Sequence, residues 1–278
     1  MKEIKITDIK GVKIGNAQDI IGATGCTVIF CENGAWAGVD VRGGAPASRE
    51  TELLKSVNMV DQIHAVMISG GSAYGLDAAS GAMAYLEEKG VGFDTGAGVV
   101  PIVCGASLFD LAVGNPKCRP DKEMGYEACK NAEEGQILEG NAGAGKFMGI
   151  KHMMKSGLGI YAVSIGELQI AAVVAVNALG DVIDIDTGKR IAGLLNEDNT
   201  KLSNTEEKMY AQYFEDKNVF SGNTSIGCIV TNAKLSKTQA NKLASIAHNG
   251  FARAIRPVHT MSDGDTIFVM ATGKVEVM

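Results

Sequence analysis

The sequence lacks any basic segment. Its 278 residues contain 26 Lys and Arg against 32 Asp and Glu, a net charge of −6, and the basic residues form no run. Because the affinity of proteins for nucleic acids comes largely from clustered Lys and Arg, this charge pattern predicts that nucleic acid is not a partner.

Long apolar runs are missing as well. No segment approaches the roughly 20 consecutive apolar residues that a membrane-spanning helix needs. The start, "MKEIKITDIKGVKIGNAQ", alternates charges and contains no apolar stretch long enough for a signal peptide. The sequence therefore predicts no membrane partner and a cytoplasmic location.

Metal-binding and disulfide motifs are also missing. The six cysteines form no C-x-x-C pair, and several lie in apolar stretches: Cys26, Cys31, Cys104, Cys118, Cys129 and Cys228. This spacing predicts buried thiols in a reducing compartment. It predicts neither a disulfide framework nor a metal site, and no cofactor is expected.

Glycine, in contrast, is abundant. The 35 glycines cluster between apolar runs, as in "RGGAP", "SGGSAYG", "DTGAG" and "GNAGAG". Such clusters mark tight turns or places where the backbone approaches another group closely. With 46% hydrophobic residues and no segment resembling a linker, the sequence predicts one folded domain over residues 1–278.

Strand and helix patterns alternate along the chain. Residues 25–32 and 35–42 resemble two strands joined by a hairpin turn at "ENG". Residues 63–70 resemble a buried strand, and the helical pattern that follows ends at Gly90. Further helices are expected at 121–135 and 236–255, and further strands at 99–106, 159–167, 168–180, 181–185, 225–232 and 266–273.

This alternation predicts an α+β fold in which helices cover mixed or antiparallel sheets. The hydrophilic segment 195–216 is expected to form an exposed loop and one helix.

Residues 140–147, "GNAGAGKF", match the start of a phosphate-binding P-loop. The motif requires Ser or Thr where this chain has Phe147, and the residues before it make a poor buried strand. We interpret the match as accidental, so no nucleotide site is predicted.

The segment "ISGGSAYGL" places Gly70, Gly71 and Ser72 between a strand and a helix. Such a turn can present helix N-terminal amides to an anion. The simpler interpretation, which we favour, is a close-packed turn with Ser72 as the N-cap. Because residues 70–74 lack the G-x-S-x-G frame, Ser72 is not expected to be a nucleophile.

Residues 221–232, "SGNTSIGCIVTN", pass from a polar turn directly into a β-branched strand. Either a loop simply ends there, or the chain cuts itself between Asn223 and Thr224. A freed α-amine, whose pKa is about 7.7–8.0, could then act as the base for the Thr224 hydroxyl. The residues alone leave both alternatives open.

Six blocks in order, from about residue 8 to the C-terminus, resemble the L-aminopeptidase/D-esterase family. They are "GVDVRGGAP", "ISGGSAYGLDAA", "GNAGAG", "KSGLG", "GNTSIGCIVTNAKLSK" and "RPVHTMSDGDTIF". The family includes D-aminopeptidases, β-peptidyl aminopeptidases and the nylon-oligomer hydrolase. The resemblance implies a four-layer α/β/β/α sandwich, self-cleavage into two chains, and a homo-oligomer, commonly a tetramer of αβ units.

The resemblance also implies site residues. Cleavage between Asn223 and Thr224 would give an α chain of 1–223 and a β chain of 224–278 with Thr224 as nucleophile. Asn177 would donate to the oxyanion, and Asp263 and Asp265 would orient Thr224 and its ammonium group.

Lys151 would assist deprotonation of Thr224, with Lys146 and Lys155 as alternatives. Phe109 stands where some relatives have a tyrosine, so the role of that hydroxyl is not transferred. The candidates for a substrate-binding loop are Gly70, Gly71, Ser72, Phe109 and Gly143.

These features predict an amide hydrolase, an aminopeptidase that acts on small peptides or amino-acid amides without metal or cofactor. Two alternatives remain. One is an acyltransferase of the same N-terminal-nucleophile type, since ornithine acetyltransferases resemble these enzymes. The other is an uncleaved, non-catalytic protein that binds a small metabolite.

Overall fold

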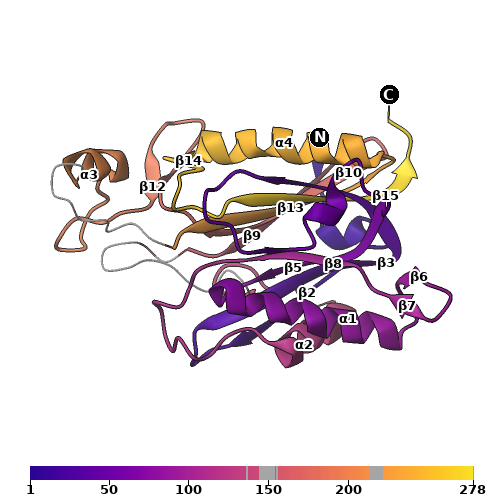
Figure 1. Ribbon diagram of the computed structural model, residues 1–278. Coiled ribbons are helices and arrows are strands. Elements are labelled where there is room, and N and C mark those ends of the chain that lie inside the picture. The colour runs from indigo at the N-terminus through magenta and orange to yellow at the C-terminus, as the bar shows by residue number, and fades with distance from the viewer. Residues whose placement is uncertain (136, 144–153, 155, 213–221, 278) are drawn as a thin grey trace.

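The computed structural model describes residues 1–135, 137–143, 154, 156–212 and 222–277. Two β-sheets pack face to face, and helices cover the outer face of each (Figure 1). Helix α4 (Lys237–Ala254) lies on one sheet, and helices α1 (Ala78–Glu88) and α2 (Lys122–Glu133) lie on the other. The predicted α+β class and α/β/β/α layering are confirmed.

The two sheets are parts of one hydrogen-bonded path. The upper sheet, under α4, has the order β1-β9-β10-β13-β15 and continues through β3 into the lower sheet, β5-β8-β4, with β2 paired to β3. Strands β13 and β15 are parallel, as are β5 and β8, while most other pairs are antiparallel. The strands are β1 Lys2–Glu3, β2 Lys13–Asp19, β3 Thr24–Val41, β4 Ser48–Arg49, β5 Gln62–Ser69, β8 Val103–Ser107, β9 Leu158–Ile165, β10 Leu168–Asn177, β13 Thr224–Ala233 and β15 Thr266–Val275.

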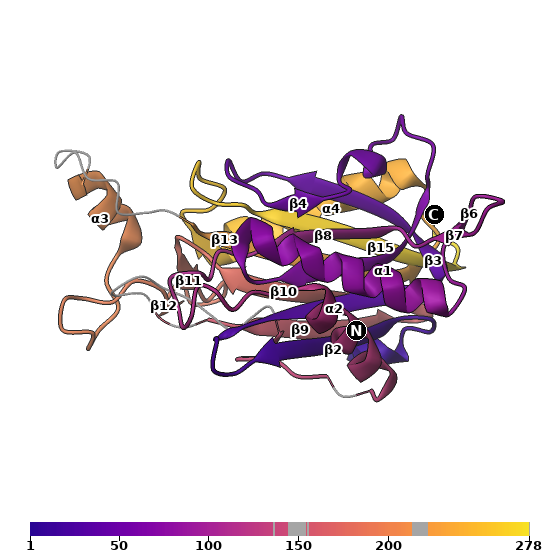
Figure 2. The same ribbon diagram turned by 60° about the horizontal axis from the view of Figure 1, so that its bottom comes forward.

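Smaller elements lie outside these layers. Strands β12 (Arg190–Ala192), β11 (Asp181–Ile183) and β14 (Ile255–Arg256) form a three-stranded sheet, and β6 (Phe93–Asp94) pairs with β7 (Val99–Val100). Helix α3 (Thr205–Gln212) projects away from the sandwich in both views (Figures 1 and 2). None of the helices in the described ranges is long and apolar enough to cross a membrane.

Strand β3 contradicts the hairpin expected at "ENG". Residues 26–30 pair with β5, whereas residues 36–41 pair with β15, so the two halves never pair with each other. The register against β5 shifts between Phe30 and Ala35, and Gly34 takes a left-handed φ of 72° within this bulge. The hairpin prediction is wrong because each half has a partner strand distant in the sequence, and the bulge lets one strand continue through the expected turn.

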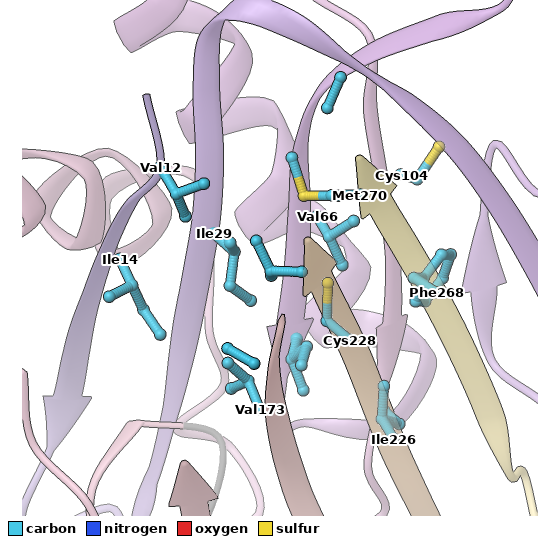
Figure 3. Packing of buried hydrophobic residues seen from close by; sticks show 14 of the residues in the cluster. Val12, Ile14, Ile29, Val66, Cys104, Val173, Ile226, Cys228, Phe268 and Met270 are labelled. Carbon is cyan, nitrogen blue, oxygen red and sulfur yellow. The ribbon is translucent and has the colours of Figure 1, made fainter. Parts of the chain in front are cut away.

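The largest core fills the space between the two sheets. Figure 3 shows its side chains converging from both sheets, among them Val12, Ile14, Ile29, Val66, Cys104, Val173, Ile226, Cys228, Phe268 and Met270. Five cysteines are buried and Cys118 is half-buried, and all six are free thiols. Burial raises the pKa of Cys104 to about 12, so this thiol stays protonated. The prediction of buried thiols is confirmed for those five.

Helices α1 and α2 run side by side across the lower sheet (Figure 2). Their contact leaves no room for a side chain at Gly125, where an added Cβ would lie 2.7 Å from the carbonyl carbon of Ala78 and 3.0 Å from its Cα. We expect Gly125→Ala to destabilise the protein by about 1–3 kcal/mol in chemical denaturation, because overpacking outweighs the gain in helix propensity. The matched control is Gly250→Ala in α4, where nothing lies within 4 Å of the new Cβ. If Gly125→Ala is as stable as that control, the close helix contact is wrong.

Candidate active site

Three strands of the upper sheet bring the candidate residues to one edge. Strand β13 begins at Thr224, and its antiparallel neighbour β10 ends at Asn177, directly opposite Thr224. Strand β15 runs parallel to β13 and begins at Thr266, so the turn before it reaches the same edge. Segments far apart in the sequence therefore meet around Thr224.

Thr224 is 4% exposed. Thr224, Ile226 and Cys228 are every second residue of β13, so their side chains lie on the same face of the strand. Because Ile226 and Cys228 lie in the core between the sheets, the Thr224 side chain faces that layer too. Its Oγ1 donates a hydrogen bond to the carbonyl oxygen of Asn223, the residue before it. The hydroxyl therefore lies against the carbonyl group of its own N-terminal peptide bond.

The same carbonyl oxygen has a second donor. The backbone N–H of Gly264 donates to Asn223 O at 2.9 Å. A Cβ at residue 264 would lie 2.7 Å from Thr224 Oγ1 and 3.0 Å from Ala45 O, so only glycine fits there without displacing the threonine. Sequence analysis did not single out Gly264, although it lies between the two predicted aspartates.

Asn177 is 5% exposed, and its side-chain amide is directed toward the turn that precedes Thr224. Nδ2 donates to Phe109 O at 2.8 Å and makes a longer bond of 3.4 Å to Gly222 O. The amide donor thus lies beside the backbone around the Asn223 to Thr224 bond, where a developing oxyanion could be stabilised.

Asp263 is buried and is held by its own turn. Its Oδ2 accepts the Thr260 N–H at 2.9 Å and the Thr260 hydroxyl at 2.6 Å. Burial raises the pKa of Asp263, and the nearby charge of Asp265 raises it further, against the hydrogen bonds from Thr260. Its backbone forms a parallel bridge with Asn223, which fixes the turn beside the candidate cleavage site.

Asp265 is also buried, but its partners differ. Oδ1 accepts the N–H of Ser225, the residue after Thr224, at 2.7 Å. Oδ2 accepts the His259 N–H at 3.1 Å and contacts His259 Nδ1 at 2.9 Å. His259 is not among the site residues predicted from the sequence, although it lies in the block "RPVHTMSDGDTIF". Its spacing from Asp265 does not indicate the contact.

A glycine cluster supports this turn. The backbone N–H groups of Arg42 and Ala45 donate to the carbonyl oxygens of Asp265, at 2.9 Å, and Asp263, at 2.8 Å. A Cβ on Gly43 would lie 2.6 Å from the carbonyl carbon of Asp263. The interpretation that glycines allow close backbone approach is confirmed at "RGGAP".

The turn at residues 70–72 is tied to Asp110. Gly71 donates its N–H to Asp110 Oδ1 at 2.6 Å, and the Thr24 hydroxyl donates to Oδ2 at 2.7 Å. Gly71, with a φ of 80°, is the N-cap of the 3₁₀ helix Ser72–Asp77, and no side chain caps it. The N-cap role predicted for Ser72 is therefore wrong, because the left-handed glycine already starts the helix.

Phe109 connects this region to the turn that precedes Thr224. Its ring packs on Gly222, where a Cβ would lie 2.5 Å from Phe109 Cγ, and Gly222 has a left-handed φ of 84°. The structure thus places Phe109 beside Asn177 and Gly222, whereas the turn at 70–72 is joined to them through the neighbouring Asp110.

Gly143 contacts a different region. Its N–H donates to Gln18 Oε1 at 2.8 Å, and it packs against Asn16 on strand β2. Lys151, Lys146 and Lys155 lie outside the described residues, as do residues 144–147 of the P-loop match. The described residues 137–139 before that match form no strand.

Metal binding has no support within the described ranges, where no group of three or more His, Cys, Asp or Glu could hold an ion. What the edge of the upper sheet offers instead is a buried hydroxyl, backbone and amide donors, and two carboxylates. These groups suit attack on a carbonyl carbon.

Comparison with known proteins gives a consistent result. A family model described as Peptidase family S58 matches residues 5–278. An uncharacterized aminopeptidase of Mycobacterium leprae (strain TN) is 40% identical over 290 residues, covering 98% of this chain and 79% of the relative. The 6-aminohexanoate-oligomer endohydrolase of Kocuria sp. (strain KY2) is 31% identical over 281 residues, covering 97% of this chain and 75% of the relative.

Solved structures share the fold. The L-aminopeptidase D-Ala-esterase/amidase from Ochrobactrum anthropi, described as a variant of the Ntn hydrolase fold, gives a TM-score of 0.70 at 19% identity, covering 96% of this chain and 73% of that one. The PH0078 protein from Pyrococcus horikoshii OT3 gives a TM-score of 0.69 at 22% identity, covering 97% and 75%.

Proposed function

The chain belongs to peptidase family S58, a family of hydrolases acting on peptide and amide bonds, and we propose that it is a self-processing aminopeptidase with Thr224 as nucleophile. The observation that carries the proposal is the position of Thr224 Oγ1 against the carbonyl of Asn223, whose oxygen also accepts the Gly264 N–H. The proposed nucleophile and a donor that could stabilise the oxyanion thus contact the carbonyl group of the same peptide bond.

Self-cleavage would proceed by transfer of the acyl group from nitrogen to oxygen. Thr224 Oγ attacks the carbonyl carbon of Asn223, and the Gly264 N–H stabilises the negative charge on the oxygen. The bond to the Thr224 nitrogen then breaks, and that nitrogen receives the proton lost by the hydroxyl. Water hydrolyses the resulting ester, which leaves an α chain of 1–223 and a β chain of 224–278.

The mature enzyme would repeat this chemistry on a substrate. The freed α-amine of Thr224 takes the proton from its own hydroxyl, which attacks the substrate amide, and Asn177 donates to the oxyanion. The amine then protonates the leaving group, and water releases the acyl group. Asp263 and Asp265 would hold the start of β13 and the new ammonium group in place.

The substrates we propose are small peptides or amino-acid amides. The support comes from relatives named as an aminopeptidase and as an endohydrolase of 6-aminohexanoate oligomers. Assembly into a homo-oligomer of αβ units remains part of the proposal, from the family resemblance.

The test is the intact mass of the denatured wild-type protein, followed by assays with amides of L-, D- and β-amino acids. We expect two fragments, 1–223 and 224–278, whose masses together exceed the full chain by one water, and release of free amino acid from at least one amide. An amino acid added as amine acceptor distinguishes the acyltransferase alternative, in which the transfer product would exceed the hydrolysis product. A chain that stays whole and hydrolyses no amide would support the metabolite-binding alternative.

A further inference from the structure

His259 lies behind the candidate site, on the opposite side of the upper sheet from the Thr224 side chain. Its ring stands edge-on to His248 of α4, with centroids 4.7 Å apart and planes at 77°, and Phe251 of the same helix lies 6.4 Å away. Thr224, in contrast, faces the layer between the sheets. His259 is therefore placed to act on the site through other residues.

Asp265 is the link between His259 and the strand that carries Thr224. One carboxylate oxygen accepts two donors from His259, its backbone N–H and ring Nδ1, and the other oxygen accepts the Ser225 N–H. His259 adopts a left-handed φ of 58°, which is uncommon for a non-glycine residue. In this conformation its backbone and ring donors both meet the same oxygen.

Within the described part of the chain, Asp265 Oδ2 accepts hydrogen bonds from His259 alone. His248 is fully buried, and its Nε2 donates to the backbone oxygen of Asp40 at 3.0 Å, since a carbonyl can only accept. Burial lowers the pKa of His248, against the hydrogen bond to the Asp40 backbone, and the nearby His259 lowers it further. Asp263 interacts electrostatically with Asp265, and the ion pair between Arg42 and Asp40 interacts with His248.

Self-cleavage makes this link more important. Once the bond before Thr224 is broken, the start of β13 becomes a chain terminus, and strand ends fray unless they are held. The bond from the Ser225 N–H to Asp265 is a charge-assisted anchor one residue from that terminus. Its geometry depends on what holds Asp265.

We propose that His259 is a positioning residue: it holds Asp265 in the orientation that anchors Ser225, and so keeps Thr224 in place for attack. The inference rests on the proposed function and adds to it a residue that contacts no reacting atom.

The test compares His259→Gly with His259→Asn. Both residues accept a left-handed φ, but only Asn retains a side-chain donor near the position of Nδ1. We expect His259→Gly to slow self-cleavage, and amide hydrolysis through kcat, by about 10–100-fold, the effect of losing a hydrogen bond to a charged group. His259→Asn should restore both rates to within about threefold of wild type.

The control is His64→Ala, which removes another buried histidine, on strand β5, and should leave the cleavage rate unchanged. Rates are measured by intact mass on protein that elutes as a folded species. If His259→Gly is not recovered folded, His259→Asp, which also accepts a left-handed φ and offers Asp265 no side-chain donor when ionised, replaces it under the same criteria.

Two outcomes would overturn the inference in different ways. A wild-type chain that neither cleaves nor hydrolyses amides removes the proposed function and this inference with it. A wild-type chain that cleaves, with His259→Gly equally fast or with Asn as slow as Gly, removes only the role of His259.

Discussion

Thr224→Ala is expected to leave the chain whole and to abolish amide hydrolysis. The substitution removes the hydroxyl that lies against the carbonyl of Asn223, so no ester can form and no new amino terminus appears. Loss of a nucleophile in a hydrolase lowers the rate on the order of 10⁴–10⁶-fold. Intact mass after prolonged incubation should show one full-length species, and amide turnover should fall to background.

The matched control for this substitution is Thr224→Ser, which keeps a hydroxyl at the same position. It should still cleave between Asn223 and the new serine and should retain measurable hydrolysis. Both variants should have a free energy of unfolding close to that of the wild-type precursor, because each substitution removes little buried volume. Cleavage of Thr224→Ala at the same bond would disprove the assignment of the nucleophile.

Asn177→Ala should lower kcat for amide hydrolysis by about 10²–10³-fold, the usual effect of losing one oxyanion donor. The side chain lies opposite Thr224 at the end of β10, and in the uncleaved chain its amide donates to backbone oxygens next to the cleavage turn. Because the donor matters most when charge develops on the substrate oxygen, KM should change much less than kcat. Steady-state kinetics on the wild-type and variant proteins, each containing both the α and the β chain, with one amide substrate would measure both constants.

Asn232→Ala is the control for this prediction. Asn232 is a buried amide at the far end of β13, where Nδ2 donates to Glu167 O at 2.8 Å, so its loss affects the same sheet without reaching the candidate site. It should reduce stability and leave kcat unchanged. If the two variants lose activity equally, the effect of Asn177 is structural and its role as an oxyanion donor is wrong.

Elements whose ends carry local signals are predictable from the amino-acid sequence. Helix α2 begins where Asp121 caps it, accepting the Met124 N–H at 2.9 Å, and the helix before it ends close to Gly90, which takes a left-handed φ of 69°. Helix α4 begins at Ser236, whose side chain forms a capping box with Gln239. Each cap joins residues three apart and the glycine stop is a single residue, so these signals are visible in any short window of the sequence.

Pairing between distant strands was not visible in this way. The turn signal at "ENG" is the same whether a strand folds back or bends into a second sheet, and only the positions of β5 and β15 decide between the two. Similarly, Ser72 has the right type for a cap, but the contact of Gly71 with Asp110, 39 residues later, places the helix start one residue earlier.

The same distinction between local signals and distant contacts applies to the candidate site. Motif resemblance predicts Thr224, Asn177 and the two aspartates as site residues, because their residue types stand in recognisable blocks. Only the tertiary structure placed the Gly264 N–H on the carbonyl of Asn223 and His259 on Asp265. Those contacts depend on the register of β13 between β10 and β15, and a shift of one residue would turn Thr224 to the opposite face of the sheet.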